Sequence, residues 1–402
     1  MAQYQSPAHV ADVVRPSRPA FCLRPHAVRK AARWFTANFP GRCLYAVKAN
    51  PSRWMIELLR DEGMSFDVAS IEEARLVRSL APDAMIGFMH PMKAPEAIAE
   101  AYHSLGVRIF SLDTVGELNK ILDVTGGADD LTLCVRLAVA SEHSRISLSS
   151  KFGAAGEEAV ELLRLTRQAA SRLGVCFHVG SQSMSPSAYE RALDKAEAAV
   201  IEAGVIVDVV DVGGGFPAPY PGMAAPPLEQ YVAAIDWRFE RMLVAENAEL
   251  WCEPGRALSA EGASLIVRVE GRKGDRLYIN DGVYGALFDA GTLDWPYPVR
   301  LLKGDQGPTE VVGYSFCGPT CDDHDVMKGP FHLPADIAVG DYIEVGILGA
   351  YGAAMTTRFN GFGAHEEFLV ADAPMMSAYD DQPAAPAVRV ARRRLRSDEH
   401  HG

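Results

Sequence analysis

The chain has 402 residues, which is longer than one ordinary domain and predicts two or three domains. Its formal net charge of −13 argues against nucleic acid as the main partner. No apolar run approaches the roughly 20 residues needed to span a bilayer. The N-terminal stretch is polar, and the seven cysteines are too few and odd in number for a secreted disulfide framework. We therefore expect a cytoplasmic protein that has no membrane segment.

The first two thirds of the chain alternate between short apolar runs rich in β-forming residues and longer stretches of helical period. Helices are predicted over residues 71–80, 115–124 and 157–173. Two of them open with capping boxes, Ser70-x-x-Glu73 and Thr114-x-x-Glu117. The predicted strands are residues 43–49, 66–70, 85–90, 107–112, 131–137, 175–180, 207–212 and 250–253.

Eight strand–helix units over roughly 230 residues predict a (β/α)8 barrel of the TIM type. A doubly wound open sheet is the alternative, because periodicity alone does not close a sheet. The barrel is favoured by the residues that end the strands, since such barrels build their active sites there. Those polar and glycine residues are Lys48, Asp67, Asp113, Arg136, His178, Gly213, Gly214, Gly215, Glu253 and Arg256.

The pattern of hydrophobic and turn residues changes after Arg256. Residues 263–270, 276–280, 311–316 and 341–347 read as short strands with Gly, Asp and Pro turns, which predicts a second, all-β domain. We assign residues 20–257 to the barrel, and residues 1–19 and 258–375 to the β-domain. Residues 376–402 are expected to form a disordered basic tail, with an interaction tail as the alternative. The tail carries Arg389, Arg392, Arg393, Arg394 and Arg396.

A phosphate site is predicted where Gly213-Gly214-Gly215 follows a predicted strand. Glycines let backbone N–H groups approach an anion without interference from a Cβ atom. In barrels, the loops after the seventh and eighth strands frequently bind phosphate. A tight turn would explain the glycines equally well, but Arg256 and Ser181 stand at neighbouring predicted strand ends and favour phosphate.

Lys48 stands in the apolar stretch Tyr45-Ala46-Val47-Lys48-Ala49-Asn50, and buried lysines are rare unless paired or reactive. It is either an amine that reaches solvent from the strand end or a Schiff-base lysine. Phosphate and lysine together suggest pyridoxal phosphate (PLP). Glu253 would then keep the pyridine nitrogen protonated, although a structural role in the Pro254 turn is the alternative.

The motifs YAVKAN, FDVAS, SKFG, FHVGSQ, GGGFP, EPGR, GPTCD and the YG…FNGF ending resemble, in order, those of the fold type III basic amino-acid decarboxylases. Ornithine decarboxylase and the bacterial lysine/ornithine decarboxylases are the most similar in pattern. The resemblance covers roughly residues 20–370. It implies a PLP-dependent carboxy-lyase of polyamine biosynthesis that acts on ornithine, lysine or both, as a homodimer with shared active sites.

The resemblance also implies a role for each site residue. Lys48 would form the imine with the cofactor, and His178 would stack on its ring. Cys321, from the other subunit, would reprotonate the α-carbon. Asp322 would bind the distal ammonium. The remaining implied cofactor residues are Asp67, Arg136, Ser181, Gly213, Gly214, Gly215, Glu253, Arg256 and Tyr351, and the remaining implied substrate residues are Asp294, Tyr284 and Phe359.

One position departs from the family pattern. Matching the family's second substrate-binding aspartate to Asp294 requires a one-residue insertion, and Asp289 is the nearby alternative. Arginine, diaminopimelate or a carboxylated polyamine stay open as substrates, and a non-catalytic binding regulator is the alternative of another class. Cys317, Cys321 and His324 lack the spacing of a metal site, so no metal is expected.

Overall fold

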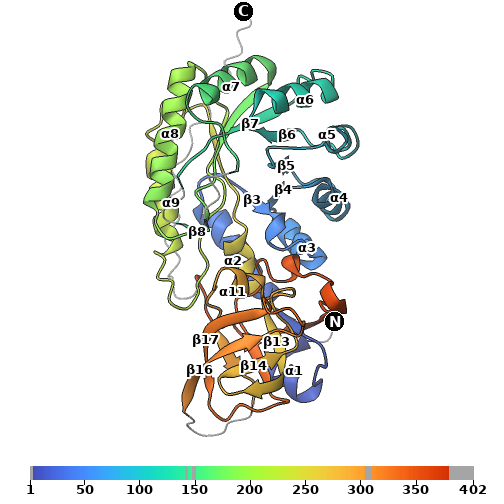
Figure 1. Cartoon of the computed structure of the whole chain (residues 1–402). Coiled ribbons are helices and arrows are strands. Elements are labelled where there is room, and N and C mark those ends of the chain that lie inside the picture. Colours follow the sequence, from blue (N-terminus) through green and yellow to red (C-terminus); the bar gives the residue numbers. More distant parts are fainter. Residues whose placement is uncertain (1–2, 141–143, 147–150, 304–309, 380–402) are drawn as a thin grey trace, which may run out of the picture.

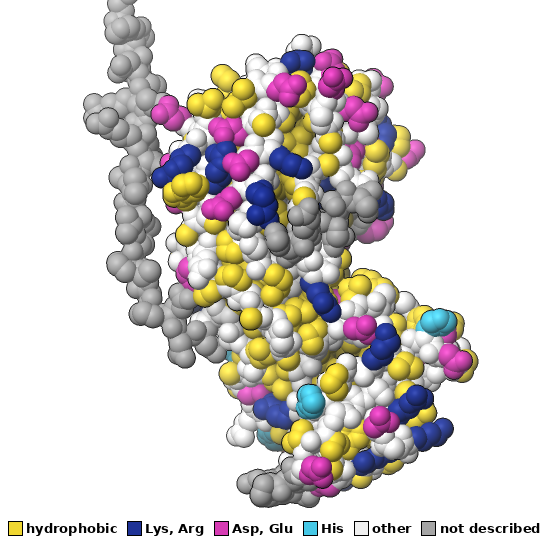
Figure 2. Space-filling model, turned by 60° about the vertical axis from the view of Figure 1, so that its left-hand side comes forward, with side chains coloured by type: hydrophobic (Ala, Val, Ile, Leu, Met, Phe, Trp, Pro, Cys, Tyr) yellow, Lys and Arg dark blue, Asp and Glu magenta, His cyan; other side chains and the backbone are white. Residues whose placement is uncertain are grey.

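A computed structural model describes residues 3–140, 144–146, 151–303 and 310–379. It shows two lobes, a barrel and a mixed β-sheet domain (Figure 1). The space-filling view in Figure 2 shows hydrophobic side chains at the narrowing between the lobes and charged side chains of both signs on each lobe. Within the described ranges, none of the helices has the length and apolar composition needed to cross a membrane.

The barrel is closed by parallel strands, which confirms the (β/α)8 prediction and excludes the open sheet. Strand β12 pairs with β3 and closes the ring at Cys252 and Cys43. Buried side chains pack both inside the ring and between the ring and its helices. In order around the ring the strands are β11 (Val209–Asp211), β12 (Glu249–Cys252), β3 (Arg42–Ala46), β4 (Ser65–Val68), β5 (Ile86–Phe88), β6 (Ile109–Leu112), β7 (Thr132–Arg136) and β9 (Arg172–Cys176).

Helices cover the outside of the barrel (Figure 1). Helix α4 begins where its capping box predicts, because Ser70 Oγ accepts a hydrogen bond from the Glu73 backbone N–H at 3.2 Å. The covering helices are α2 (Pro25–Asn38), α3 (Arg53–Asp61), α4 (Ile71–Leu80), α5 (Pro95–Ala99), α6 (Val115–Thr125), α7 (Gly156–Ala169), α8 (Ser187–Ala203) and α9 (Leu228–Phe239).

Three predicted boundaries are wrong for one reason, the extent of strand pairing. Strand β3 stops at Ala46, where its pairing with Asp67 of β4 ends, and Lys48 lies in the short 3-10 turn η1 (Val47–Ala49). Strand β9 stops at Cys176, so His178 follows the strand. Helix α7 stops at Ala169, because residues 172–176 pair with β7 instead.

The second domain is a nine-stranded mixed sheet, as the all-β prediction requires. It also contains strands that the sequence pattern did not reveal. The members are β1 (Gln3–Tyr4), β2 (Ala20–Leu23), β13 (Ala263–Lys273), β14 (Arg276–Ile279), β15 (Val299–Leu301), β16 (Val311–Cys317), β17 (Val326–Pro334), β18 (Tyr342–Val345) and β19 (Glu366–Val370).

Two of the expected domain boundaries need correction. Strand β2 pairs with β13 and β19, so residues 20–23 belong to the sheet and not to the barrel. The tail does not begin at residue 376, because Tyr379 is buried against the barrel and donates a hydrogen bond to the Ala257 carbonyl at 2.7 Å. The five tail arginines lie outside the described residues.

Candidate active site

A small cavity at the carboxyl ends of the barrel strands collects most of the side chains that were predicted to bind the cofactor. Its lining joins residues that are far apart in the sequence but that follow neighbouring strands. The lining residues are Ala46, Lys48, His178, Ser181, Gly214, Gly215, Phe216, Glu253, Gly255, Arg256 and Tyr351.

Lys48 and Asp67 form an ion pair at the edge of this cavity. The Lys48 Nζ atom lies 3.5 Å from Asp67 Oδ2, and Asp67 is buried on β4 whereas 42% of the Lys48 side chain is accessible. Burial alone would lower the pKa of Lys48, but attraction to Asp67, and further to Glu253, raises it overall. The amine is therefore paired with a buried carboxylate while part of the side chain reaches solvent, and the Schiff-base role of Lys48 stays a prediction.

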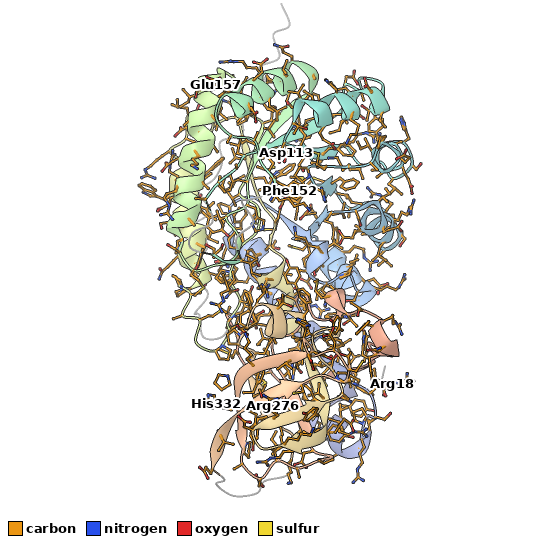
Figure 3. All side chains as sticks on the ribbon, in the orientation of Figure 1. Arg18, Asp113, Phe152, Glu157, Arg276 and His332 are labelled. Carbon is orange, nitrogen blue, oxygen red and sulfur yellow. The ribbon has the colours of Figure 1, made fainter. Side chains whose placement is uncertain are left out.

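Arg136 ends β7 on the same side of the barrel. Its guanidinium lies 5.5 Å from the centre of the Phe152 ring. Burial raises the pKa of Asp67, and the positive charge of Arg136 opposes part of that rise. Asp113 accepts a hydrogen bond from the Gly153 N–H at 2.9 Å, and Figure 3 shows Asp113 and Phe152 near each other within the barrel lobe.

His178 follows β9 and is half-buried. Its Nδ1 atom accepts a hydrogen bond from the Gly180 N–H at 3.0 Å. Burial, together with repulsion from Lys48 and Arg136, lowers the pKa of His178 well below its usual value. The ring is therefore a neutral imidazole with its proton on Nε2, and it lines the cavity beside Gly214.

The Gly213–Gly215 loop comes so close to neighbouring backbone that no side chain fits. Gly213 has a φ of +67°, and a Cβ atom added to it would lie 2.1 Å from the Phe177 carbonyl oxygen. A Cβ atom on Gly214 would lie 2.7 Å from the Glu253 carbonyl oxygen. This bare backbone is the kind of cradle in which N–H groups approach a phosphate.

Arg256 supplies the positive charge beside that loop. Its Nε atom donates to Ser181 Oγ at 3.4 Å and its Nη1 atom to the Tyr220 hydroxyl at 3.2 Å. The guanidinium also lies 4.7 Å from the centre of the Tyr351 ring and 4.4 Å from that of Trp295. Burial would lower its pKa, but its neighbours raise it, so Arg256 stays charged.

Asp289, the alternative to Asp294, pairs with Arg256 in the interior of the protein. Asp289 is buried, and its Oδ2 atom lies 3.4 Å from Arg256 Nη2. Asp294 lies away from the cavity, has a φ of +48°, and forms an ion pair with Lys328 at 3.4 Å while 53% of its side chain is exposed. The role of Asp294 as a second acidic substrate ligand stays a prediction.

Cys321 and Asp322 lie in the β-domain, and neither lines the cofactor cavity among the residues that the structure describes. Cys321 is exposed. Asp322 accepts from the Tyr284 hydroxyl at 2.6 Å, and this bond, with those from His324, lowers the pKa of Asp322 to about 2. The Tyr284 and Phe359 rings are 4.6 Å apart.

The loop that carries Cys321 and Asp322 borders a groove on the β-domain. Arg276, which Figure 3 shows in this lobe, also lines the groove. Cys317 is buried on β16, whereas Cys321 is exposed. No group of side chains that could hold a metal ion occurs within the described parts of the chain.

Sequence reasoning missed two buried acids of the site. Asp211 ends β11 beside Glu253, and its only sequence signal is a carboxylate inside an apolar run. Asp325 holds the Cys321 loop: its Oδ1 accepts from the Val283 N–H at 2.7 Å, and its Oδ2 accepts from both the N–H and the hydroxyl of Thr320.

Comparisons with known proteins agree with this geometry. Residues 25–260 match the family model described as the pyridoxal-binding domain of pyridoxal-dependent decarboxylases. A lysine/ornithine decarboxylase of Selenomonas ruminantium is 34% identical over 348 residues, which are 83% of this chain and 84% of the relative.

Solved structures also resemble the chain over most of its length. A lysine/ornithine decarboxylase from Vibrio vulnificus complexed with putrescine is 29% identical, with a TM-score of 0.78 over 92% of this chain and 99% of that one. An arginine decarboxylase of Paramecium bursaria Chlorella virus bound to agmatine is 26% identical, with a TM-score of 0.81 over 90% of this chain and 98% of that one.

The chain belongs to the family of pyridoxal-dependent decarboxylases. It is a PLP-dependent carboxy-lyase of fold type III that decarboxylates a basic amino acid, as its motifs predicted. The residues present fit the cofactor, because an amine, a buried acid and a cradle that any Cβ atom would fill border one cavity.

Proposed function

We propose that the protein decarboxylates ornithine, lysine or both, and so forms putrescine or cadaverine. The observation that carries this proposal is an ionised carboxylate, Asp322, held by Tyr284 and His324 in the loop that resembles the substrate loop of this family. A carboxylate whose pKa is lowered stays charged at any working pH, and it suits a distal ammonium.

Within the barrel, each side chain has a proposed task toward the cofactor. PLP, when bound, supplies a protonated ring that accepts the electron pair of the bond broken when CO₂ leaves. Lys48 holds the cofactor through its amine, and Asp67 balances that charge. Glu253 would bind the ring nitrogen, and His178 would pack on the ring. The list of proposed phosphate ligands is Ser181, Gly213, Gly214, Gly215, Arg256 and Tyr351.

The β-domain is proposed to complete the site of a second copy. Cys321 would donate a proton to the α-carbon after CO₂ has left, and Asp322 would orient the substrate by its distal ammonium. Both residues lie far in sequence from the barrel residues, and the cofactor cavity of the described chain has no lining residue from this loop. A homodimer with two shared sites is the arrangement that would bring them together.

A second candidate substrate is arginine. It is favoured by the likeness to the arginine decarboxylase structure, whose ligand is agmatine. A guanidinium is planar and would form a bidentate pair with Asp322, whereas an ammonium is a compact point charge.

The seven cysteines are all free thiols, which supports the proposal that the protein works in the reducing cytoplasm.

The test is a CO₂-release assay on the PLP-loaded protein with ornithine, lysine, arginine and diaminopimelate. We expect ornithine and lysine to give the highest kcat/KM values. The difference between these two should be within about 10–200-fold, because one methylene contributes only about 1–3 kcal/mol in a pocket. Turnover of arginine alone would favour the second candidate, and release of CO₂ from none of the four would favour a non-catalytic regulator.

A further inference from the structure

Asp211 is a buried acid at the centre of the site that the proposed function leaves unused. It is the last residue of β11 and has no exposed surface. Its Oδ1 atom accepts a hydrogen bond from the Gly213 N–H at 2.8 Å. Its Oδ2 atom is buried and accepts no hydrogen bond from the described residues. A buried carboxylate oxygen left in this way calls for an explanation.

The group that faces Asp211 is the carboxyl group of Glu253. Strands β11 and β12 pair in parallel, and the Glu253 N–H donates to the Gly213 carbonyl at 2.8 Å. The side chains of Asp211 and Glu253 lie close enough to share a hydrogen. Asp211 therefore contacts both halves of the cofactor site, namely the glycine loop and the acid proposed to face the ring nitrogen.

A proton between these two acids follows from their surroundings. Burial raises the pKa of Asp211 to about 6. Burial also raises the pKa of Glu253 well above its usual value, and the nearby Asp211 and Asp67 raise it further. Two adjacent buried carboxyl groups cannot both ionise at low cost. The other titratable groups that act on the pair are Asp67, Lys48, Arg136, Cys134, Cys176 and Cys252.

We propose that Asp211 is a positioning residue of the cofactor site, which fixes the glycine loop through one oxygen and shares a proton with Glu253 through the other. This inference rests on the proposed place of Glu253 at the ring nitrogen. When PLP binds, Glu253 would give the shared proton to that nitrogen, so that the proton would not have to come from solvent. The two carboxylates would then balance the charge of the protonated ring.

The experiment measures PLP binding to the apoprotein and not turnover, so its result is independent of the choice of substrate. Calorimetry at pH 7 in buffers of different ionisation enthalpy gives both the dissociation constant and the number of protons taken up per PLP. Asp211→Asn keeps an oxygen for the Gly213 N–H but removes the charge that holds the proton on Glu253. Replacing Asp211 removes one of the causes that raise the pKa of Glu253, so Glu253 should hold its proton less fully in this variant. We therefore expect the variant to take up more protons per PLP than the wild type, by at most one.

Two further variants sharpen the comparison. Asp211→Ala loses both contacts, and we expect its PLP dissociation constant to rise at least about tenfold. Asp281→Asn is the matched control: Asp281 is also a buried acid whose pKa burial raises to about 6, but it lies in the β-domain, outside the cofactor cavity. It should match the wild type in both PLP affinity and proton uptake.

Weaker PLP binding by Asp211→Asn with unchanged proton uptake would overturn the proposal, because Asp211 would then be only a structural brace. Unchanged affinity in Asp211→Ala would overturn it as well. If these variants do not fold, infrared spectroscopy of the wild-type apoprotein still tests whether the two acids share a proton. A protonated-carboxyl infrared band at pH 7 should disappear in the difference spectrum on adding PLP, and the absence of that change refutes the shared proton. If Glu253→Gln binds PLP as the wild type does, the proposed place of Glu253 fails instead.

Discussion

Gly214 is the residue at which the glycine loop and the ring-facing side chains come closest. A Cβ atom there would lie 2.7 Å from the Glu253 carbonyl oxygen and 3.0 Å from His178 Nε2. Backbone cannot move out of the way as the end of a flexible side chain can, so even one methyl group must displace the cradle. Glycine is therefore needed at this position because no Cβ atom fits, and not because the turn has to be flexible.

We expect Gly214→Ala to raise the PLP dissociation constant at least about tenfold, equivalent to about 1.4 kcal/mol. Fluorescence titration of the apoprotein with PLP measures the effect. The control is Gly116→Ala on helix α6, where the nearest atom to an added Cβ is 3.9 Å away. That variant should bind PLP normally, and equal affinities for both variants would show that the loop tolerates a side chain.

Asp281 makes stability depend on pH, and the sign can be worked out. Burial raises its pKa to about 6, so the folded protein keeps a proton that the unfolded chain releases at lower pH. The stabilisation is present below about pH 4 and is lost as the pH rises through about 6, with a size of roughly 2–3 kcal/mol. In urea unfolding from pH 4.5 to 7, the stability of the wild type relative to Asp281→Asn should therefore fall with rising pH. Parallel curves would contradict this.

At the scale of elements, the sequence predicts where helices begin better than where strands end. Thr114 Oγ1 accepts from the Glu117 N–H at 3.1 Å and starts α6, as its capping box predicts. The Glu117 side chain, however, does not return to the helix start but holds the buried Lys93 ammonium at 2.9 Å. Strand ends depend on pairing partners, so the apolar stretch through Lys48 could not reveal that pairing stops at Ala46.

The short loop between β16 and β17 depends on Asp325 for its shape. This buried carboxylate accepts three hydrogen bonds, one from Val283 and two from Thr320, and so ties the loop of Cys321 and Asp322 to the segment that carries Tyr284. The sequence could not identify this role, because an acid three residues after Asp322 looks the same whether it is exposed or buried.

We expect Asp325→Asn to lower kcat/KM about tenfold or more, since losing buried hydrogen bonds to a charged group costs about 1.5–3 kcal/mol. The absorbance of bound PLP should not change, because Asp325 does not line the cofactor cavity. Asp323→Asn is the matched control, an exposed acid in the same loop. If both variants lose activity equally, the loop responds to its charge and not to the bonds of Asp325.

At the scale of the whole molecule, the barrel could be predicted because its units repeat in chain order, each strand pairing with the next. The β-domain could be predicted only as a class. Strand β2 lies between β13 and β19, partners about 240 and 350 residues away in the chain, and no local pattern encodes such a pairing. The same difference applies to the site: its barrel residues follow from strand ends, whereas the position of Asp294 depends on an insertion that only the structure can locate.

Shared active sites can be tested by mixing two inactive chains. Lys48→Ala lacks the cofactor amine of the barrel, and Cys321→Ala lacks the proton donor of the β-domain. If each site takes Lys48 from one copy and Cys321 from the other, half of the dimers in an equal mixture are hybrids, and each hybrid has one site with both residues intact. Activity should then recover to about a quarter of the wild-type value.

A mixture of two Lys48→Ala preparations is the control and should stay inactive. Subunit exchange has to be shown in the same tubes, for example by co-purification of differently tagged chains. Exchange without recovery would mean that Cys321 serves the site of its own chain or no site at all, and the cofactor cavity would then have to be completed within one subunit.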